Sequence, residues 1–191
     1  MKEVMKEEKK ERTLVLIQKD AVARKLAGEI ISRFEKNGLK IVAMKSVLPT
    51  REMAEKHYRT TDEQTIGIGN KTMRGMRERG NEKEIKKLYG SEDAKEIGTQ
   101  VVEILRQFLT KGMLIAMVLE GENAIERVRK IVGYTDPAKA EKGTIRGDLG
   151  TDYIAKSSME KRKLENLVHA ADSPEAAKRE IDVWFKKDEL K

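Results

Sequence analysis

The run MLIAMVL, residues 113–119, consists of seven consecutive apolar residues. A continuous apolar run of this length is typical of a strand that is buried on both faces of a sheet. Apolar residues at helical spacing flank it on both sides, from Val101 to Phe108 and from Ala124 to Val132. We therefore predict a central strand with a helix before it and a helix after it.

Further elements alternate along the rest of the chain. An apolar, β-branched run covers 13–17, and apolar residues at helical spacing follow from Leu26 to Phe34, before Gly38. Ser173 and Pro174 fit the cap and the first turn of a last helix. We predict strands at 13–17, 39–43, 113–119 and 164–169, with helices at 26–37, 51–58, 101–108, 124–132 and from 174 onward. This order suits an α/β (α+β) fold of the ferredoxin-like split βαβ type, although periodicity alone also allows other α/β sheets.

Two stretches lack a clear period. Residues 61–97 are rich in charge and glycine, and we interpret them as an insertion of short helices packed on the outside of the domain. Residues 133–165 are interpreted as a loop, and loops of this length within a compact domain are usually functional.

Composition limits the class of protein. A chain of 191 residues suffices for one well-packed domain, so we predict a flexible charged tail at 1–10 and a single domain at 11–191. The sequence contains no apolar stretch long enough for a transmembrane helix and no apolar signal core, so no membrane partner is expected. It has no cysteine, which fits a cytoplasmic protein. The net charge of +7 is spread over 40 basic and 33 acidic residues, a pattern typical of a solvated surface rather than of a nucleic-acid-binding face.

His169 is the strongest candidate for chemistry. It lies in NLVHAADS, residues 166–173, between a predicted strand and the start of the last helix. An imidazole is partly neutral at pH 7 and can attack an electrophile without a separate base. The other histidine, His57, is assigned a structural role. No group of His, Cys, Asp or Glu has the spacing of metal ligands, and the phosphate-binding GxxxxGK[ST] loop is absent.

Several motifs together resemble one family. In chain order they are ERTL (11–14), AGEIISRFE (27–35), HY (57–58), VLEG (118–121), GYTDP (133–137), GTIRGD (143–148), NLVH (166–169) and WF (184–185). In this order and spacing the chain closely resembles nucleoside diphosphate kinase from about Glu11 to Leu190, apart from the stretch 61–97. The resemblance selects the ferredoxin-like fold, with an antiparallel four-stranded sheet covered by helices. It implies ping-pong transfer of the γ-phosphoryl group from a nucleoside triphosphate such as ATP to a nucleoside diphosphate.

The same resemblance implies roles for individual residues. His169 carries the phosphoryl group, Glu180 orients its imidazole, and Tyr58 matches a tyrosine near the active histidine. The residues that match nucleotide-binding positions are Arg129, Thr135 and Arg146 for the phosphates and Asn166 for the sugar. Mg²⁺ is expected to arrive on the nucleotide phosphates rather than in a protein cage. The resemblance also implies a homo-oligomer, either a hexamer or a tetramer.

Three positions depart from the family pattern. Gln18 matches a lysine that reaches nucleotide and phosphate, and the adjacent Lys19 points elsewhere if the strand continues. Ala171 matches a serine whose hydroxyl is expected to bond the orienting glutamate; one such bond is worth roughly 1 kcal/mol. Ile66 falls by direct count where the family stacks an aromatic residue on the base.

These departures leave two alternatives to an active kinase. The first is a degenerate member that binds nucleotide as a scaffold or regulator with little turnover. The second is a nucleic-acid-binding module on a ferredoxin-like sheet. Such modules stack bases on exposed aromatic residues, and this chain has only three Phe, four Tyr and one Trp.

Overall fold

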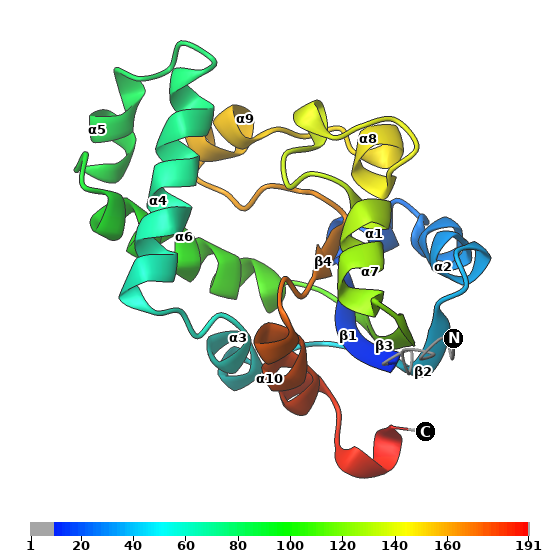
Figure 1. The fold of residues 1–191 in the computed structure, drawn as a ribbon. Helices are drawn as coiled ribbons and strands as arrows, with labels where there is room; N and C mark the ends of the chain where they lie inside the picture. Colours follow the sequence, from blue (N-terminus) through cyan, green and yellow to red (C-terminus); the bar gives the residue numbers. More distant parts are fainter. Residues whose placement is uncertain (1–9, 191) are drawn as a thin grey trace, which may run out of the picture.

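The computed structural model describes residues 10–190 (Figure 1). Lys10 is the first residue of the first strand, and the remainder of the tail predicted at 1–10 lies outside the described residues. Within residues 10–190, no helix has both the length and the apolar character needed to cross a membrane.

Four strands form one antiparallel sheet in the order β2-β3-β1-β4. Their bounds are β1 (Lys10–Ile17), β2 (Lys40–Val47), β3 (Leu114–Glu122) and β4 (Val168–Ala170). The apolar run of 113–119 forms most of β3, and its residues Ala116 to Leu119 are fully buried. Both the central strand and the ferredoxin-like arrangement are therefore confirmed.

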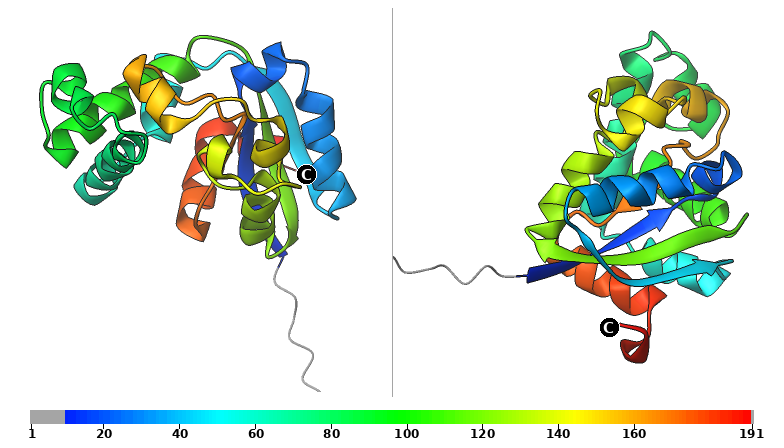
Figure 2. Two further views of the ribbon diagram at one scale, coloured as in Figure 1. Left: turned by 90° about the horizontal axis from the view of Figure 1, so that it is seen from above. Right: turned by 90° about the vertical axis from the view of Figure 1, so that its right-hand side faces the viewer.

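Helices cover both faces of this sheet (Figure 2). Their bounds are α1 (Lys19–Ala23), α2 (Ala27–Lys36), α3 (Arg51–His57), α4 (Asp62–Arg77), α5 (Glu84–Tyr89), α6 (Ala94–Leu109), α7 (Ala124–Val132), α8 (Ile145–Leu149), α9 (Ile154–Met159) and α10 (Pro174–Trp184), with 3-10 turns at Pro137–Lys139 and Lys187–Glu189. Val15 and Ile17 of β1 pack with α2 and α7, whereas Leu14 and Leu16 pack with α3 and α10 on the opposite face. This alternation follows from the two-residue period of a strand.

The stretch 61–97 differs from the prediction in the length of its first helix. α4 has 16 residues, and Thr61 and Gln64 form a capping box that fixes its start. Two glycines allow α4 and α6 to touch. A Cβ on Gly69 would lie 1.9 Å from the carbonyl oxygen of Ala94, and a Cβ on Gly98 would lie 1.9 Å from that of Thr65. Glycine in this region therefore serves helix packing as well as loops.

This stretch has a small core of its own and stands at one side of the sheet (Figure 1). The buried members of that core are Met73, Met76, Ile85, Tyr89 and Ile97.

The stretch 133–165 is also more ordered than predicted. It contains α8 and α9, helices of five and six residues, which are too short to produce a visible period. α9 packs beside α4, where Ile154 lies against Gly75. The last strand begins at Val168 rather than 164, since Leu167 has a φ of 69° and the chain bends there.

Candidate active site

A cavity of about 450 Å³ lies between the end of β4 and the helices α3, α4, α7 and α10. Seven of the eight site residues predicted from the sequence line it: Tyr58, Arg129, Thr135, Arg146, Asn166, His169 and Glu180. They come from separate parts of the chain, and the sheet and its covering helices bring them together.

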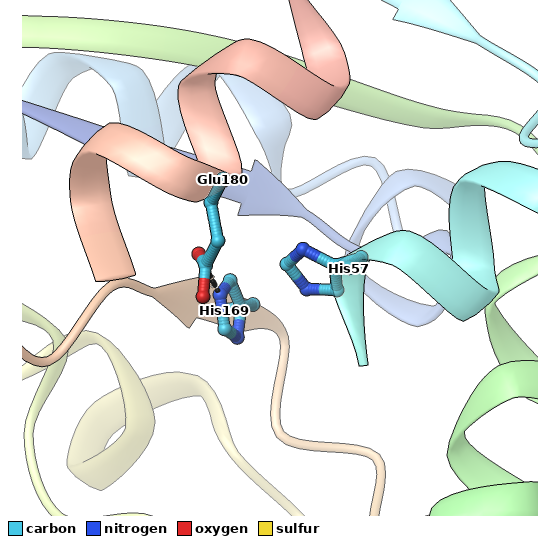
Figure 3. Close-up of side chains that lie close together, drawn as sticks. All are labelled: His57, His169 and Glu180. Carbon is cyan, nitrogen blue, oxygen red and sulfur yellow. Dashed lines mark hydrogen bonds and ion pairs between the residues drawn. The ribbon is translucent and has the colours of Figure 1, made fainter. Parts of the chain in front are cut away.

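His169 and Glu180, which both line this cavity, form a hydrogen bond (Figure 3). His169 lies in β4 opposite Leu16 of β1, and its Nε2 is 2.7 Å from Oε2 of Glu180 on α10. A carboxylate can only accept hydrogen bonds, so Nε2 carries the ring proton. The lone pair of Nδ1 is consequently available as a nucleophile.

His57 lies edge-on to this nucleophile (Figure 3). The two imidazole centroids are 4.5 Å apart, and Nδ1 of His57 accepts a hydrogen bond of 3.2 Å from Nε1 of Trp184. Burial lowers the pKa of His57 well below its usual value, and the nearby His169 and Arg179 lower it further. His57 is therefore a neutral residue of the core.

The ligand atoms of His57, His169 and Glu180 all lie within 4.8 Å of one another. Such a group can hold a metal ion. Here Glu180 bonds the ring of His169, and Trp184 bonds the ring of His57. These hydrogen bonds explain why the three side chains lie together, since they hold the ring of His169 in place.

Tyr58 is half-buried at the edge of the cavity. Burial raises the pKa of its hydroxyl well above the usual value, and the negative charge of Glu180 adds to this effect. The phenol therefore stays protonated at neutral pH and can donate a hydrogen bond into the cavity.

Five cationic side chains line the cavity without a carboxylate partner. They are Arg59, Lys71, Arg129, Arg146 and Lys163, and none of them takes part in an ion pair within residues 10–190. Lys71, Arg146 and Lys163 are buried or half-buried, and charges in such places are normally paired. Positive charge gathered around an open cavity in this way suits an anionic ligand.

Arg146 is the most buried arginine of this set. Its guanidinium donates to the carbonyl oxygens of Gly133, Asn166 and Val168, at 3.0, 3.1 and 2.5 Å. Burial lowers the pKa of Arg146 to about 10, and the positive charge of Arg129 contributes. It remains charged at neutral pH and ties Gly133 to the segment 166–168 at the start of β4.

Two lysines in the cavity were not predicted from the sequence. Lys71 of α4 donates to Oγ1 of Thr135 at 2.8 Å, and burial lowers its pKa, followed by the charge of Arg146. Lys163 donates to the side chains of Gln18 and Asn166. Lys71 shares a helix face with Gln64, Gly67 and Ile68, a spacing that is visible in the sequence once α4 is known. Lys163 lies in an irregular segment, where no periodic signal exists.

Ile66 is the predicted residue that the structure does not bring into the cavity. It lies on α4 with 38% of its surface exposed, on a different face from Ile68, which does line the cavity. Two residues along a helix correspond to a rotation of about 200°, so the direct count selects the wrong side of α4. Ile68 replaces Ile66 as the candidate to cover a base.

Ala171 is buried in an apolar cluster with Ile125, Ala176 and Ala177. The His169–Glu180 bond is formed at 2.7 Å without a hydroxyl at position 171. The loss of the family serine therefore leaves the orientation of the imidazole intact.

The arrangement combines a nucleophilic nitrogen with cations that face it across one cavity. Phosphoryl transfer requires these two elements, because the enzyme contributes mainly positioning and positive charge. Comparisons with known proteins agree with this chemistry. The family model "Nucleoside diphosphate kinase" matches residues 11–67 and 68–190.

Curated relatives cover nearly the whole chain. A nucleoside diphosphate kinase of Pyrobaculum aerophilum is 44% identical over 180 residues, which are 94% of this chain and 97% of the relative. One of Methanocaldococcus jannaschii is 42% identical over 95% of this chain and 97% of the relative.

Solved structures agree. An NDP kinase from Pyrobaculum aerophilum superposes with a TM-score of 0.90 at 42% identity, covering 95% of this chain and 99% of the other. A transition-state mimic of the Borrelia burgdorferi nucleoside-diphosphate kinase, with bound vanadate and ADP, has a TM-score of 0.74 at 31% identity, covering 95% and 90%. With sequence, fold and cavity in agreement, the chain belongs to the nucleoside diphosphate kinase family.

Proposed function

We propose that His169 carries the phosphoryl group between nucleotides in this chain. The lone pair of Nδ1 attacks the γ-phosphorus of a nucleoside triphosphate, the bond to the bridging oxygen breaks, and its electron pair leaves with the diphosphate. A terminal oxygen of a second diphosphate then attacks the phosphorus, and the P–N electron pair returns to Nδ1. The hydrogen bond from Nε2 to Glu180 carries this proposal, because it leaves Nδ1 free and stabilises the imidazole as it gains positive charge.

The other predicted residues have proposed roles around this step. Arg129 and Arg146 bind phosphate oxygens, for which a guanidinium offers paired donors. The hydroxyl of Thr135 joins them, and Asn166 contacts the sugar. The protonated hydroxyl of Tyr58 donates to the phosphoryl group on His169.

The residues that line the cavity fit a Mg²⁺ ion that is held by the phosphate oxygens of the nucleotide. The carboxylates lining the cavity are Asp172 and Glu180, and Glu180 already bonds His169. When bound, Mg²⁺ neutralises part of the phosphate charge. The cavity itself supplies the positive side chains on the remaining sides of the phosphates.

The labelled phosphoryl group tests the proposal directly. Incubation with Mg²⁺ and γ-labelled ATP is expected to leave an acid-labile label on His169, located by peptide mass spectrometry. Addition of GDP is expected to discharge the label as GTP. ATP binding without a label on His169 would contradict the proposal and would indicate a nucleotide-binding protein with little turnover.

Lys71 extends the phosphate site into the stretch 61–97. Replacing Lys71 with methionine removes an ammonium that lies among Arg146, Arg74 and Arg129. We expect the KM for nucleotides to rise about ten-fold, the effect of one charge-assisted hydrogen bond, with kcat changing less. Steady-state kinetics measures this, with the exposed Lys87→Met on α5 as the matched control. Equal KM values for the two variants would exclude Lys71 from the site.

We further propose that the chain forms a homo-oligomer in the cytoplasm, where nucleoside di- and triphosphates are both available. β2 is an edge strand of the sheet, and edge strands are common sites of association. Met44 in β2 and Leu48 just after it are 51% and 65% exposed. Light scattering at several concentrations distinguishes a tetramer or hexamer from a monomer.

A further inference from the structure

Lys163 is a buried lysine that forms no ion pair within residues 10–190. The residue is 6% exposed, and its ammonium donates to Oε1 of Gln18, to the carbonyl oxygen of Leu164 at 2.7 Å and to Oδ1 of Asn166 at 3.0 Å. All three acceptors are neutral groups. They satisfy the hydrogen bonds of the ammonium, but none of them carries a negative charge.

The position of Lys163 connects this charge to the reaction. It lines the same cavity as His169 and Arg146, and the cation lies 4.6 Å from the centre of the Phe108 ring. The neighbouring Lys19 also lies over that ring, at 4.3 Å, and does not line the cavity. Lys163 is therefore the lysine that reaches the cavity at Gln18.

We propose that Lys163 is a nucleotide-binding residue whose ammonium contacts the phosphates of the bound nucleoside di- or triphosphate, with Gln18 and Asn166 holding it in place. The inference rests on the proposed function and adds a phosphate-binding residue to it. A phosphate oxygen supplies the negative charge that the three neutral acceptors lack. The uncharged Gln18 then positions Lys163, a lysine from another segment of the chain.

The pKa of Lys163 is lowered to about 7, and burial is the largest of several causes. The charged groups that face it are Asp20 on α1, Arg146 on α8, and Asp152 and Glu165 in the adjoining loops. At about pH 8 the free protein thus holds mainly the neutral amine, whereas a bound phosphate favours the ammonium. Nucleotide binding is then expected to take up a proton at about pH 8 and not at about pH 6, where the lysine is already charged.

Two substitutions test the proposal by kinetics. Lys163→Gln is expected to raise the KM for ATP about ten-fold or more, the effect of losing one charge-assisted hydrogen bond. The double variant Gln18→Lys with Lys163→Gln returns an ammonium to the same pair of positions and is expected to recover most of that loss. The exposed Lys161→Gln, two residues away, is the control. An unchanged KM in Lys163→Gln, or no recovery in a folded double variant, would overturn the proposal.

Calorimetry provides a second test, in which the result that would contradict the proposal is measured on the wild-type protein. Binding of Mg²⁺–ADP to the wild-type protein is measured in buffers of different ionisation enthalpy, which reports protons taken up. Uptake at about pH 8 that disappears in Lys163→Gln supports the contact, and binding to the wild-type protein without uptake contradicts it. Labelling of His169 in the wild-type protein is scored separately, so failure of the kinase proposal itself appears as a missing label.

Discussion

Replacing His169 with alanine is expected to lower kcat on the order of 10⁴-fold or more, the usual consequence of removing a covalent nucleophile. The loss follows from the geometry, because Nδ1 of His169 is the free imidazole nitrogen in the cationic cavity. Steady-state transfer from ATP to GDP measures the effect. The affinity for ATP is expected to change little, since the five unpaired cations of the cavity remain.

His57 does not replace the missing nucleophile, although its ring lies 4.5 Å away. It is 3% exposed, and Trp184 occupies its Nδ1. Phosphoryl label on His57 in the His169→Ala protein, or turnover within ten-fold of the wild type, would contradict the assignment of His169. Circular dichroism and ATP binding serve as controls that the variant is folded.

The predictable parts of the fold are those in which buried positions produce a regular pattern of apolar residues in the sequence. The run 113–119 indicated β3 because both of its faces are covered. Ser173 and Pro174 indicated the start of α10, and the side chain of Ser173 does accept the hydrogen bond of a cap. The cap depends on a contact between residues close in sequence, and the strand depends on burial that continues over consecutive residues.

The stretches that were mispredicted lack such a signal. Helices α8 and α9 are shorter than two full turns. In α4, Gly69 lies at the contact with α6 and Gly75 at the contact with α9, so these glycines reflect helix packing rather than a loop. Their place is decided by tertiary packing, which outweighs local propensity.

The site divides in the same way. His169, Arg146 and Asn166 were found because they lie in motifs with fixed spacing. Lys163 was not, because its partner Gln18 is 145 positions away in sequence. A contact of that kind is created by the fold alone, and a single sequence carries no trace of it. Position 18 itself carries no lysine, but the cavity does contain one beside Gln18, which is Lys163.

Replacing Arg146 with lysine is expected to damage both stability and catalysis. The guanidinium bonds three carbonyl oxygens, those of Gly133, Asn166 and Val168. A lysine keeps the charge but lacks the planar fork that reaches all three. Each hydrogen bond to a charged group contributes about 1.5–3 kcal/mol, so the free energy of unfolding is expected to fall by about 3 kcal/mol. Urea unfolding measures this change.

The catalytic effect is expected to exceed what instability explains. Loss of a positioned donor to a reacting oxyanion typically lowers kcat about 10²–10³-fold, and Arg146→Lys is measured under conditions where it is fully folded. Arg33→Lys is the matched control, since Arg33 bonds Asp148 of the same helix α8 from the surface. Surface ion pairs contribute about 0–1 kcal/mol, so the control is expected to retain both stability and activity. If Arg146→Lys lost stability but kept wild-type kcat and KM, Arg146 would be a structural tie between Gly133 and the segment 166–168 rather than a phosphate-binding residue. If it lost activity without stability, the three carbonyl contacts would be incidental, and the charge of Arg146 in the cavity would be its main contribution.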